Sequence, residues 1–170
     1  DSFAGGFQAN ASGASSLALG VNTSATKSRA YAAGFNASAT GNKAMALGAQ
    51  ASASNFSAYS AGSLANASGP NSMALGTQAN ANAESSYAAG HYSRASGDNS
   101  TAMGTYANAS ANDAYAIGYK ANASAINALA FGPEANASGV NSMALGSNST
   151  AEAANAFAGG VDSVAQGVNS

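Results

Sequence analysis

Glycine recurs at every fourteenth position of the sequence, without insertion or deletion, and no other feature limits the fold as strongly. The positions four and two residues before this glycine, and three and five residues after it, hold only Ala, Ser or a single Thr. An uninterrupted period of this kind is typical of a protein built from stacked structural repeats. The repeat glycines are Gly6, Gly20, Gly34, Gly48, Gly62, Gly76, Gly90, Gly104, Gly118, Gly132, Gly146 and Gly160.

The repeat period equals two heptads, so an alanine-rich coiled coil has to be considered. The large side chains exclude it, because they stand three residues and one residue before the repeat glycine, as Met73 and Leu75 do. A helical seam requires a spacing of three or four residues, whereas a spacing of two is that of a strand. The 20 glycines would also destabilise a helix by roughly 1 kcal/mol each.

Each repeat is therefore expected to form two strands and two turns. Residues 72–75 form a strand with its small side chains inward and its large ones outward, and a second strand around Asn80 directs its two alanines inward. Turns are expected at the repeat glycine and near Gly69-Pro70-Asn71. The prediction is an all-β, parallel β-solenoid, or β-roll, of about twelve 14-residue coils stacked at ~4.8 Å, forming one domain over residues 1–170.

Composition agrees with a thin interior and excludes several functions. The chain has 47 Ala and 20 Gly, which leaves few side chains for a core of ordinary thickness. Lys and Arg together number 5, Asp and Glu 7, and the net charge is −2, so no nucleic-acid-binding surface is indicated. There is no Cys, and no apolar run approaches the ~18 residues of a membrane-spanning helix. We expect no membrane insertion by this segment.

The large outward side chains are expected to form an apolar stripe along the stacked coils. Such a stripe exceeds what a monomer exposes to water, so it predicts self-association. The two stripe positions also compensate in volume: Tyr31 is followed by Ala33, whereas Met45 is followed by Leu47. The expected interface residues are Leu17, Leu19, Met45, Leu47, Met73, Leu75, Tyr87, Met103, Tyr115, Ile117, Leu129, Phe131, Met143 and Leu145.

One six-residue motif resembles a known family. Asn71-Ser72-Met73-Ala74-Leu75-Gly76 and residues 141–146, with variants at 99–104 and 113–118, are similar to the repeat of YadA-like heads of trimeric autotransporter adhesins. That repeat is usually written Asn-Ser-Val-Ala-Ile-Gly-x-x-Ser. The resemblance spans all 170 residues, and it departs from the motif where Ala79 and Ala121 replace the final serine.

The resemblance implies a left-handed roll, assembled as a parallel homotrimer around a threefold axis. It also implies a bacterial surface location, with a coiled-coil stalk and a C-terminal outer-membrane anchor outside this segment. The partners that it implies are host extracellular matrix proteins, such as collagen, fibronectin or laminin, or the host cell surface. Residue patterns alone predict self-association, without the number of copies or the handedness.

An enzyme is not indicated. His91 is the only histidine, the acidic residues are scattered, and no nucleophile, base or phosphate-binding loop can be assembled from the sequence. No cofactor or metal site is expected. Glu84 and Asp98 share one turn position on adjacent coils, and we interpret them as solvated turn residues.

Two other non-enzymatic functions remain to be compared with adhesion. An ice-binding solenoid needs a regular Thr lattice, but the row four residues after the repeat glycine is mostly Asn and Ser, with Thr only at Thr150. Ice binding is therefore disfavoured. A passive spacer segment of a surface fibre, with adhesive sites elsewhere, stays open as an alternative.

One stretch of the surface departs from the Ser and Asn background and is the candidate ligand site. Tyr92, Tyr106 and Lys120 share the position two residues after the repeat glycine on successive coils, so we expect them to form a strip. Tyr and Arg are frequent at binding hot spots. The competing interpretation is that Tyr92 and Tyr106 pack along the coils while the neighbouring rings border the interface. The candidate residues are His91, Tyr92, Arg94, Tyr106, Tyr119 and Lys120.

Overall fold

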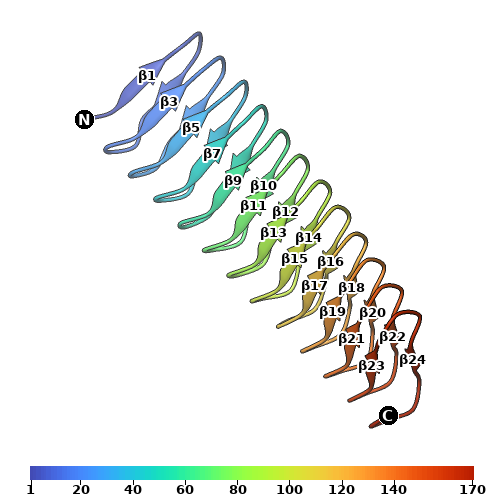
Figure 1. Ribbon diagram of the computed structural model, residues 1–170. Coiled ribbons are helices and arrows are strands. Elements are labelled where there is room, and N and C mark those ends of the chain that lie inside the picture. Colours follow the sequence, from blue (N-terminus) through green and yellow to red (C-terminus); the bar gives the residue numbers. More distant parts are fainter. The chain divides into compact units, whose positions relative to one another are not determined.

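The computed structural model describes residues 1–170, which form strands and turns and no helix. The chain divides into an N-terminal unit, Asp1–Ser85, and a C-terminal unit, Ser86–Ser170. Each unit repeats one coil: a three-residue strand, a turn at the repeat glycine, a two-residue strand and a second turn (Figure 1). The expected all-β solenoid of 14-residue coils is confirmed.

The N-terminal unit holds twelve strands. Its three-residue strands are β1 (Phe3–Gly5), β3 (Leu17–Leu19), β5 (Tyr31–Ala33), β7 (Met45–Leu47), β9 (Tyr59–Ala61) and β11 (Met73–Leu75). Its two-residue strands are β2 (Asn10–Ala11), β4 (Ser24–Ala25), β6 (Ser38–Ala39), β8 (Ser52–Ala53), β10 (Asn66–Ala67) and β12 (Asn80–Ala81).

The C-terminal unit repeats this arrangement. Its three-residue strands are β13 (Tyr87–Ala89), β15 (Thr101–Met103), β17 (Tyr115–Ile117), β19 (Leu129–Phe131), β21 (Met143–Leu145) and β23 (Phe157–Gly159). Its two-residue strands are β14 (Arg94–Ala95), β16 (Asn108–Ala109), β18 (Asn122–Ala123), β20 (Asn136–Ala137), β22 (Thr150–Ala151) and β24 (Val164–Ala165).

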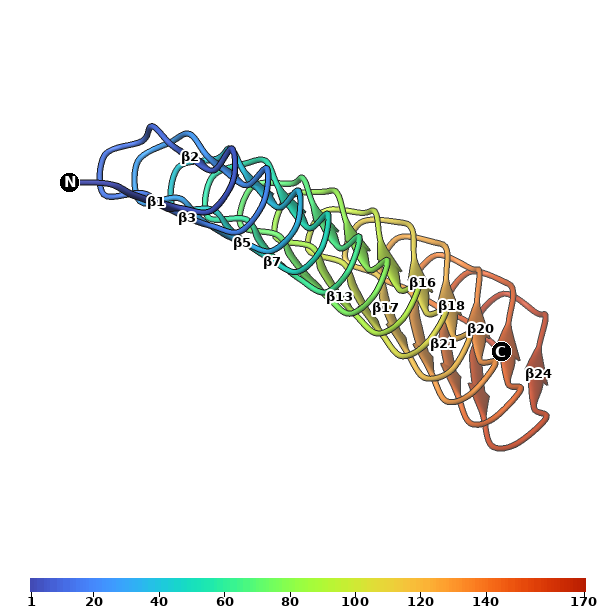
Figure 2. The ribbon, with the colours of Figure 1, turned by 90° about the horizontal axis from the view of Figure 1, so that it is seen from above.

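Within each unit the odd-numbered strands form one parallel sheet and the even-numbered strands form another. Every strand pairs with the equivalent strand of the next coil in a register of one full repeat, so that Leu17 lies beside Tyr31 and Asn108 beside Asn122. Figure 2 shows the two rows of strands on opposite sides of the flattened coils of the N-terminal unit. Equivalent side chains are therefore stacked directly over one another.

The interior of both units is lined by the small residues that the repeat predicts. Ala74, Ala79 and Ala81 are completely buried, and Ser72 is 1% exposed. The largest fully buried side chain in the chain is Thr23. Two short strands joined by tight turns leave no room for a larger side chain between the sheets, which explains the restriction to Ala, Ser and Thr.

The repeat glycine is required by both conformation and space. Gly34 has φ of 135°, and a Cβ atom there would lie 2.4 Å from the carbonyl oxygen of Gly48 on the next coil. Any other residue would be strained by its backbone angles and would collide with backbone atoms. The uninterrupted row of glycines thus follows from the close approach of successive coils.

Each coil also places two other residues in the left-handed region, one in each turn. These residues stand two after and five before the repeat glycine, with φ between 51° and 61°. Asn and Asp tolerate this conformation best after Gly, which explains their frequency at both positions. Tyr92 and Tyr106 occupy the first of these positions, at φ of 56° and 61°.

No helix long and apolar enough to cross a membrane is found.

Candidate functional site

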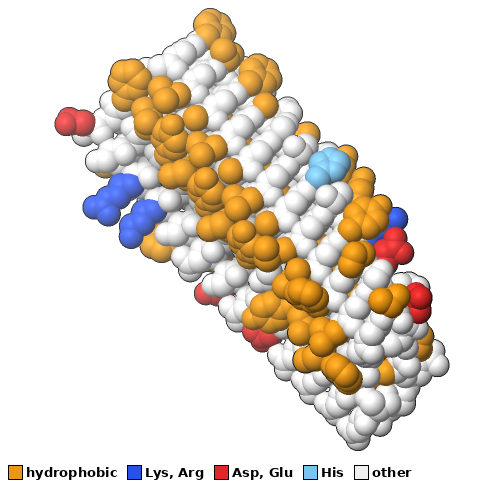
Figure 3. Space-filling view, in the orientation of Figure 1, with side chains coloured by type: hydrophobic (Ala, Val, Ile, Leu, Met, Phe, Trp, Pro, Cys, Tyr) orange, Lys and Arg blue, Asp and Glu red, His pale blue; other side chains and the backbone are white.

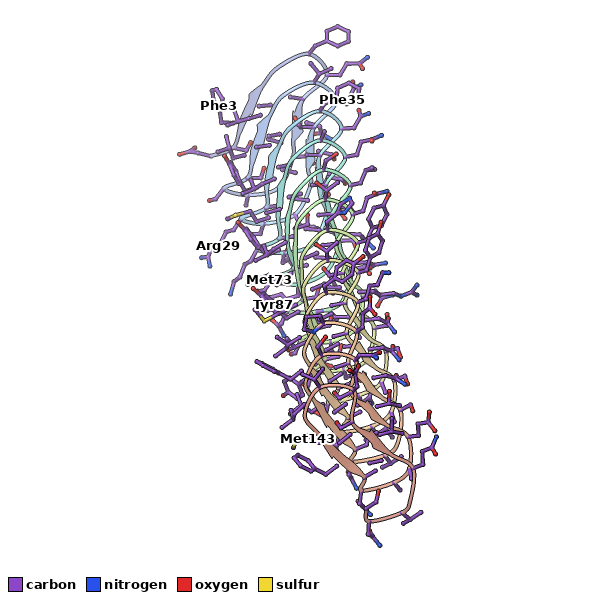
Figure 4. The ribbon with its side chains drawn as sticks, turned by 45° about the vertical axis from the view of Figure 1, so that its right-hand side comes forward. Phe3, Arg29, Phe35, Met73, Tyr87 and Met143 are labelled. Carbon is purple, nitrogen blue, oxygen red and sulfur yellow. The ribbon has the colours of Figure 1, made fainter.

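The outward side chains of the three-residue strands form the predicted apolar stripe in each unit. Figure 3 shows it as a band of orange side chains over the odd-numbered strands. In the C-terminal unit, Tyr87 and Met143 point away from the ribbon on the same side (Figure 4). Met73 is 38% exposed, Met103 40% and Phe131 54%. The other expected interface residues, from Leu17 to Leu145, are half-buried or exposed in this single chain.

On the coils of Phe3 and Phe157, the volume compensation along the stripe has a cause within one chain. A Cβ atom on Gly159 would lie 2.8 Å from Cε1 of Phe157, and one on Gly5 would lie 3.0 Å from Cε1 of Phe3. The aromatic ring therefore folds over the second stripe position of its own strand and excludes a larger side chain there. Volume compensation along the stripe therefore does not by itself require a second chain.

The candidate ligand residues form an aromatic cluster at one turn of the C-terminal unit. The rings of Tyr92 and Tyr106 are stacked, with centroids 5.2 Å apart and planes within 4° of parallel. His91 meets Tyr92 edge-on at 4.3 Å and Tyr106 edge-on at 6.0 Å. Tyr92 is 42% exposed and Tyr106 48%. The two tyrosines thus pack along the coils and remain partly exposed to solvent.

The three other candidate residues lie on the coil of Tyr92 or on the coil after Tyr106, and they make contacts of their own. Lys120 is exposed, and its Nζ lies 5.1 Å from the ring centroid of Tyr119. Arg94 lies on β14, is exposed, and donates a hydrogen bond from Nε to Oγ of Ser96 at 3.0 Å. This second strand directs Arg94 away from the coil interior, whereas Tyr92 belongs to the turn.

Asparagine ladders on the outer surface were not foreseen from the sequence. On the second strands of the C-terminal unit, Asn108 donates to Asn122 and Asn122 to Asn136, both from Nδ2 to Oδ1 at 2.8 Å. A second ladder joins Asn127, Asn141 and Asn155 through the turns at 3.0 to 3.1 Å. Stacked amides of this kind each satisfy a donor and an acceptor. The sequence contains the pattern that predicts these ladders, because Asn recurs with the period of the glycine repeat.

The serine position of the family motif is an internal one. Ser93 and Ser149 occupy it three residues after the repeat glycine, and both are completely buried. Each hydroxyl donates to the carbonyl oxygen of the preceding repeat glycine at 2.9 Å. Ala79 and Ala121 at this position are buried too, so the departure from the motif changes the interior and leaves the outer surface unaltered.

The surface has no enclosed pocket, and its candidate sites are the stripe and the turns. The family model described as "YadA head domain repeat (2 copies)" matches residues 1–23, 25–51, 53–79, 67–86, 81–107, 109–135 and 137–163. The chain belongs to the YadA head family. These YadA head repeats cover both units, and the predicted resemblance is confirmed. The family is adhesive and structural, not enzymatic, so the chain is an adhesin-type head.

One solved structure similar to this YadA head is the crystal structure of the collagen-binding domain of the Yersinia adhesin YadA. The two share 23% sequence identity with a TM-score of 0.46, over 94% of this chain and 69% of that chain. No curated protein matches the sequence significantly.

Proposed function

We propose that residues 1–170 form one head domain of a homotrimeric bacterial surface adhesin, which attaches the cell to host extracellular matrix proteins or to host cells. Membership of the YadA head family supports the adhesive role. In this proposal the head is displayed at the bacterial surface and is held to the outer membrane by a region outside this segment.

The exposed apolar stripe is the observation that carries the homotrimeric assembly in this proposal. Phe3, Met73, Phe131 and Phe157 are each more than one third exposed, and they lie on one face of their units. Burying a side chain of this size stabilises a protein by ~1.5 to 3 kcal/mol. Three parallel copies that place their stripes against a common axis would remove this surface from water along successive coils.

The test of assembly is sedimentation of the wild-type chain and of Leu75→Asp. Wild type is expected to sediment as a trimer at micromolar concentration. Leu75→Asp should abolish assembly, because it would place three carboxylates near the axis. Asn80→Asp is the matched control, since it adds the same charge on the outward side of β12 in the same coil. A folded wild-type monomer, or a fully trimeric Leu75→Asp variant, would contradict the proposed interface.

The candidate ligand surface is the aromatic cluster at His91, Tyr92 and Tyr106, with Arg94, Tyr119 and Lys120 beside it. Tyrosine in the left-handed turn position is costlier than Asn, which supports a role beyond folding for Tyr92 and Tyr106. Three copies per trimer would bind a repetitive matrix fibre with higher avidity.

The test of attachment combines Tyr92→Gln, Arg94→Asn and Tyr106→Asn, residues typical of other coils. Binding of wild type and variant to immobilised collagen, fibronectin and laminin, and to host cells, is measured together with sedimentation. We expect the trimeric variant to lose most of its attachment. Undiminished attachment would exclude this cluster as the ligand site. A wild-type trimer that binds none of these partners would instead favour the passive spacer.

A further inference from the structure

Charge is distributed unevenly along the chain, although the net charge is only −2. Residues 2–83 contain no Asp or Glu, but they contain three of the five cations, namely Lys27, Arg29 and Lys43. The rest of the chain from residue 84 onward holds six of the seven acidic residues. Residues 2–83 are therefore a basic stretch in a chain that is acidic overall.

The three cations come from two consecutive turns on one edge of the N-terminal unit. Lys27 and Arg29 lie in the same turn, which the bond from the N–H of Ala30 to the carbonyl of Lys27 closes at 3.1 Å. Lys43 occupies the position of Arg29 on the next coil, and its N–H donates to the carbonyl of Ser28 at 2.9 Å. All three side chains are exposed. Figure 3 shows cationic side chains projecting beside the stripe, and Figure 4 labels Arg29 there.

Residues 2–83 supply no carboxylate to neutralise this basic edge, and the one carboxylate in the same row of turn positions of the N-terminal unit is that of Asp1, two coils before Arg29. Coils stack at ~4.8 Å, so the backbones of Arg29 and Lys43 are held that close together, and like charges directly opposite on paired coils are destabilising. A parallel copy at the same height would not neutralise them, because residues 2–83 of that copy also lack carboxylates. Both residues also have positive φ, 57° and 60°, where Asn is easier to accommodate. The sequence therefore retains two unfavourable features at this edge: like charges on adjacent coils, and residues other than Asn or Gly at positive φ.

An aromatic ring continues this edge on the following coil. Phe56 is 46% exposed, and its ring centroid lies 5.2 Å from Nζ of Lys43. The contact directs the ammonium group over the ring and adds an apolar face beside the cations. The edge thus combines a guanidinium, two ammonium groups and one aromatic face, in a row that follows the direction of coil stacking.

We propose that this basic edge, formed by Lys27, Arg29, Lys43 and Phe56, binds a sulfated polysaccharide. Sulfate groups keep their negative charge at all physiological pH values, and the guanidinium of Arg29 can pair with two oxyanion oxygens at once. A linear polyanion lying along the coils would meet the cations in succession, and a sugar ring can rest on Phe56. This is a second ligand class on a different surface from the aromatic cluster, and it does not depend on binding to matrix proteins.

The test is binding of the 170-residue chain to immobilised heparin, with fully desulfated heparin and anionic phosphatidylserine vesicles as separate arms. The test variant combines Arg29→Ser with Lys43→Ser. Serine is the natural residue at this turn position on two other coils, as Ser15 and Ser57. The control is Arg94→Asn with Lys120→Asn, which removes two cations from the C-terminal unit. Circular dichroism and sedimentation confirm that each variant is folded and assembled like wild type.

We expect wild type to bind heparin, with an affinity that falls as salt is raised, and not desulfated heparin. Arg29→Ser with Lys43→Ser should weaken binding roughly tenfold, while the control should bind like wild type. Equal loss in the control would show a non-specific charge effect, and equal binding to desulfated heparin would exclude sulfate recognition. Either result overturns the proposal, as does binding to vesicles alone or to no probe. Attachment to collagen is expected to be unchanged in the Arg29→Ser, Lys43→Ser variant, which separates this inference from the proposed function.

Discussion

The two units have the same backbone and different surfaces. In the N-terminal unit the stripe position three residues before the repeat glycine alternates strictly between an aromatic and an aliphatic residue, from Phe3 to Met73. The only acidic residues of this unit are Asp1 and Glu84, one near each end. In the C-terminal unit Leu129 is followed by Met143 one coil later, which breaks the alternation. This second unit carries the aromatic cluster and the longer asparagine ladders, whereas the N-terminal unit has the single rung from Asn66 to Asn80. The interior residues and the repeat glycines hardly differ between the units.

The comparison shows that the coil constrains its inner positions and leaves its outer positions free. A methyl group is the largest side chain that most inner positions hold, so both units converge there on Ala and Ser. Outer side chains need only remain compatible with stacking at ~4.8 Å, and they can carry opposite charge in the two halves. Four pairs of substitutions test how far this separation holds.

The largest effect is expected at the repeat glycines, and it should be the same in both units. Gly34→Ala and Gly132→Ala each introduce a Cβ atom about 2.4 to 2.5 Å from a carbonyl oxygen of the next coil, at φ near 135°. We expect each to lower the free energy of unfolding by about 3 kcal/mol or more. Chemical denaturation measures this, with Ala49→Ser in the adjacent exposed turn as the control. A mild effect in one unit alone would show that the backbones differ.

Overpacking of the interior is expected to have the next largest effect. Ala53→Leu and Ala123→Leu place a large side chain at positions that are completely buried. Each should cost about 2 kcal/mol, because the sheets have to separate to admit it. Ser52→Leu, one residue away on the outward side of β8, should change the melting temperature little. If Ser52→Leu and Ala53→Leu melted alike, the inward and outward assignment would be wrong.

Buried hydroxyl groups offer a stabilising substitution in each unit. Oγ of Ser60 and Oγ of Ser100 are buried and have no hydrogen-bond partner. Ser60→Ala and Ser100→Ala should therefore raise the free energy of unfolding by about 1 kcal/mol. Ser72→Ala should not, since the Ser72 hydroxyl donates to the carbonyl of Gly69 at 2.7 Å. Thermal melting of the three variants distinguishes these cases, and equal shifts would contradict the explanation.

The smallest effect concerns the turn ladder that only the C-terminal unit possesses. Asn141→Ser removes the amide between Asn127 and Asn155 and should destabilise the protein by about 0.5 to 1 kcal/mol. The reverse change in the N-terminal unit, Ser57→Asn, should be neutral or slightly stabilising, because Asn suits the left-handed turn at φ of 51°. Denaturant midpoints measure both. A stabilising Asn141→Ser would show that the ladder is not a source of stability.

The fold was predictable because one period encodes almost all of it. Glycine, the small positions and the spacing between Met73 and Leu75 define the strands, the turns and the inward face. The left-handed turn residues were less evident. Asn71 indicates such a position, but Arg29, Lys43 and Tyr92 hold the same backbone conformation with side chains that give no hint of it.

The candidate sites were predictable only in part. The spacing of Tyr92 and Tyr106 predicted a shared strip, whereas their stacking depends on side-chain rotation that no spacing determines. The basic edge was missed because the net charge conceals it: three cations in one half are outweighed by six acidic residues from Glu84 onward. A charge count for each half of the chain would have revealed it.

The alternation along the stripe bears on how heads of this kind change length. Gly13, Gly41 and Gly69, seven residues before a repeat glycine, recur every second coil, in step with the aliphatic stripe residues. A Cβ atom at any of them would lie within 2.0 Å of a carbonyl oxygen on the next coil. An in-frame gain or loss of two coils keeps these glycines on the same coils as the aliphatic stripe residues. A gain or loss of one coil instead shifts the two-coil alternation by one coil. Between Gly97 and Gly139 the phase shifts by one coil: Ala125 stands where the two-coil pattern would place glycine, and Leu129 is followed on the next coil by Met143. A gain or loss of a single coil would produce this pattern.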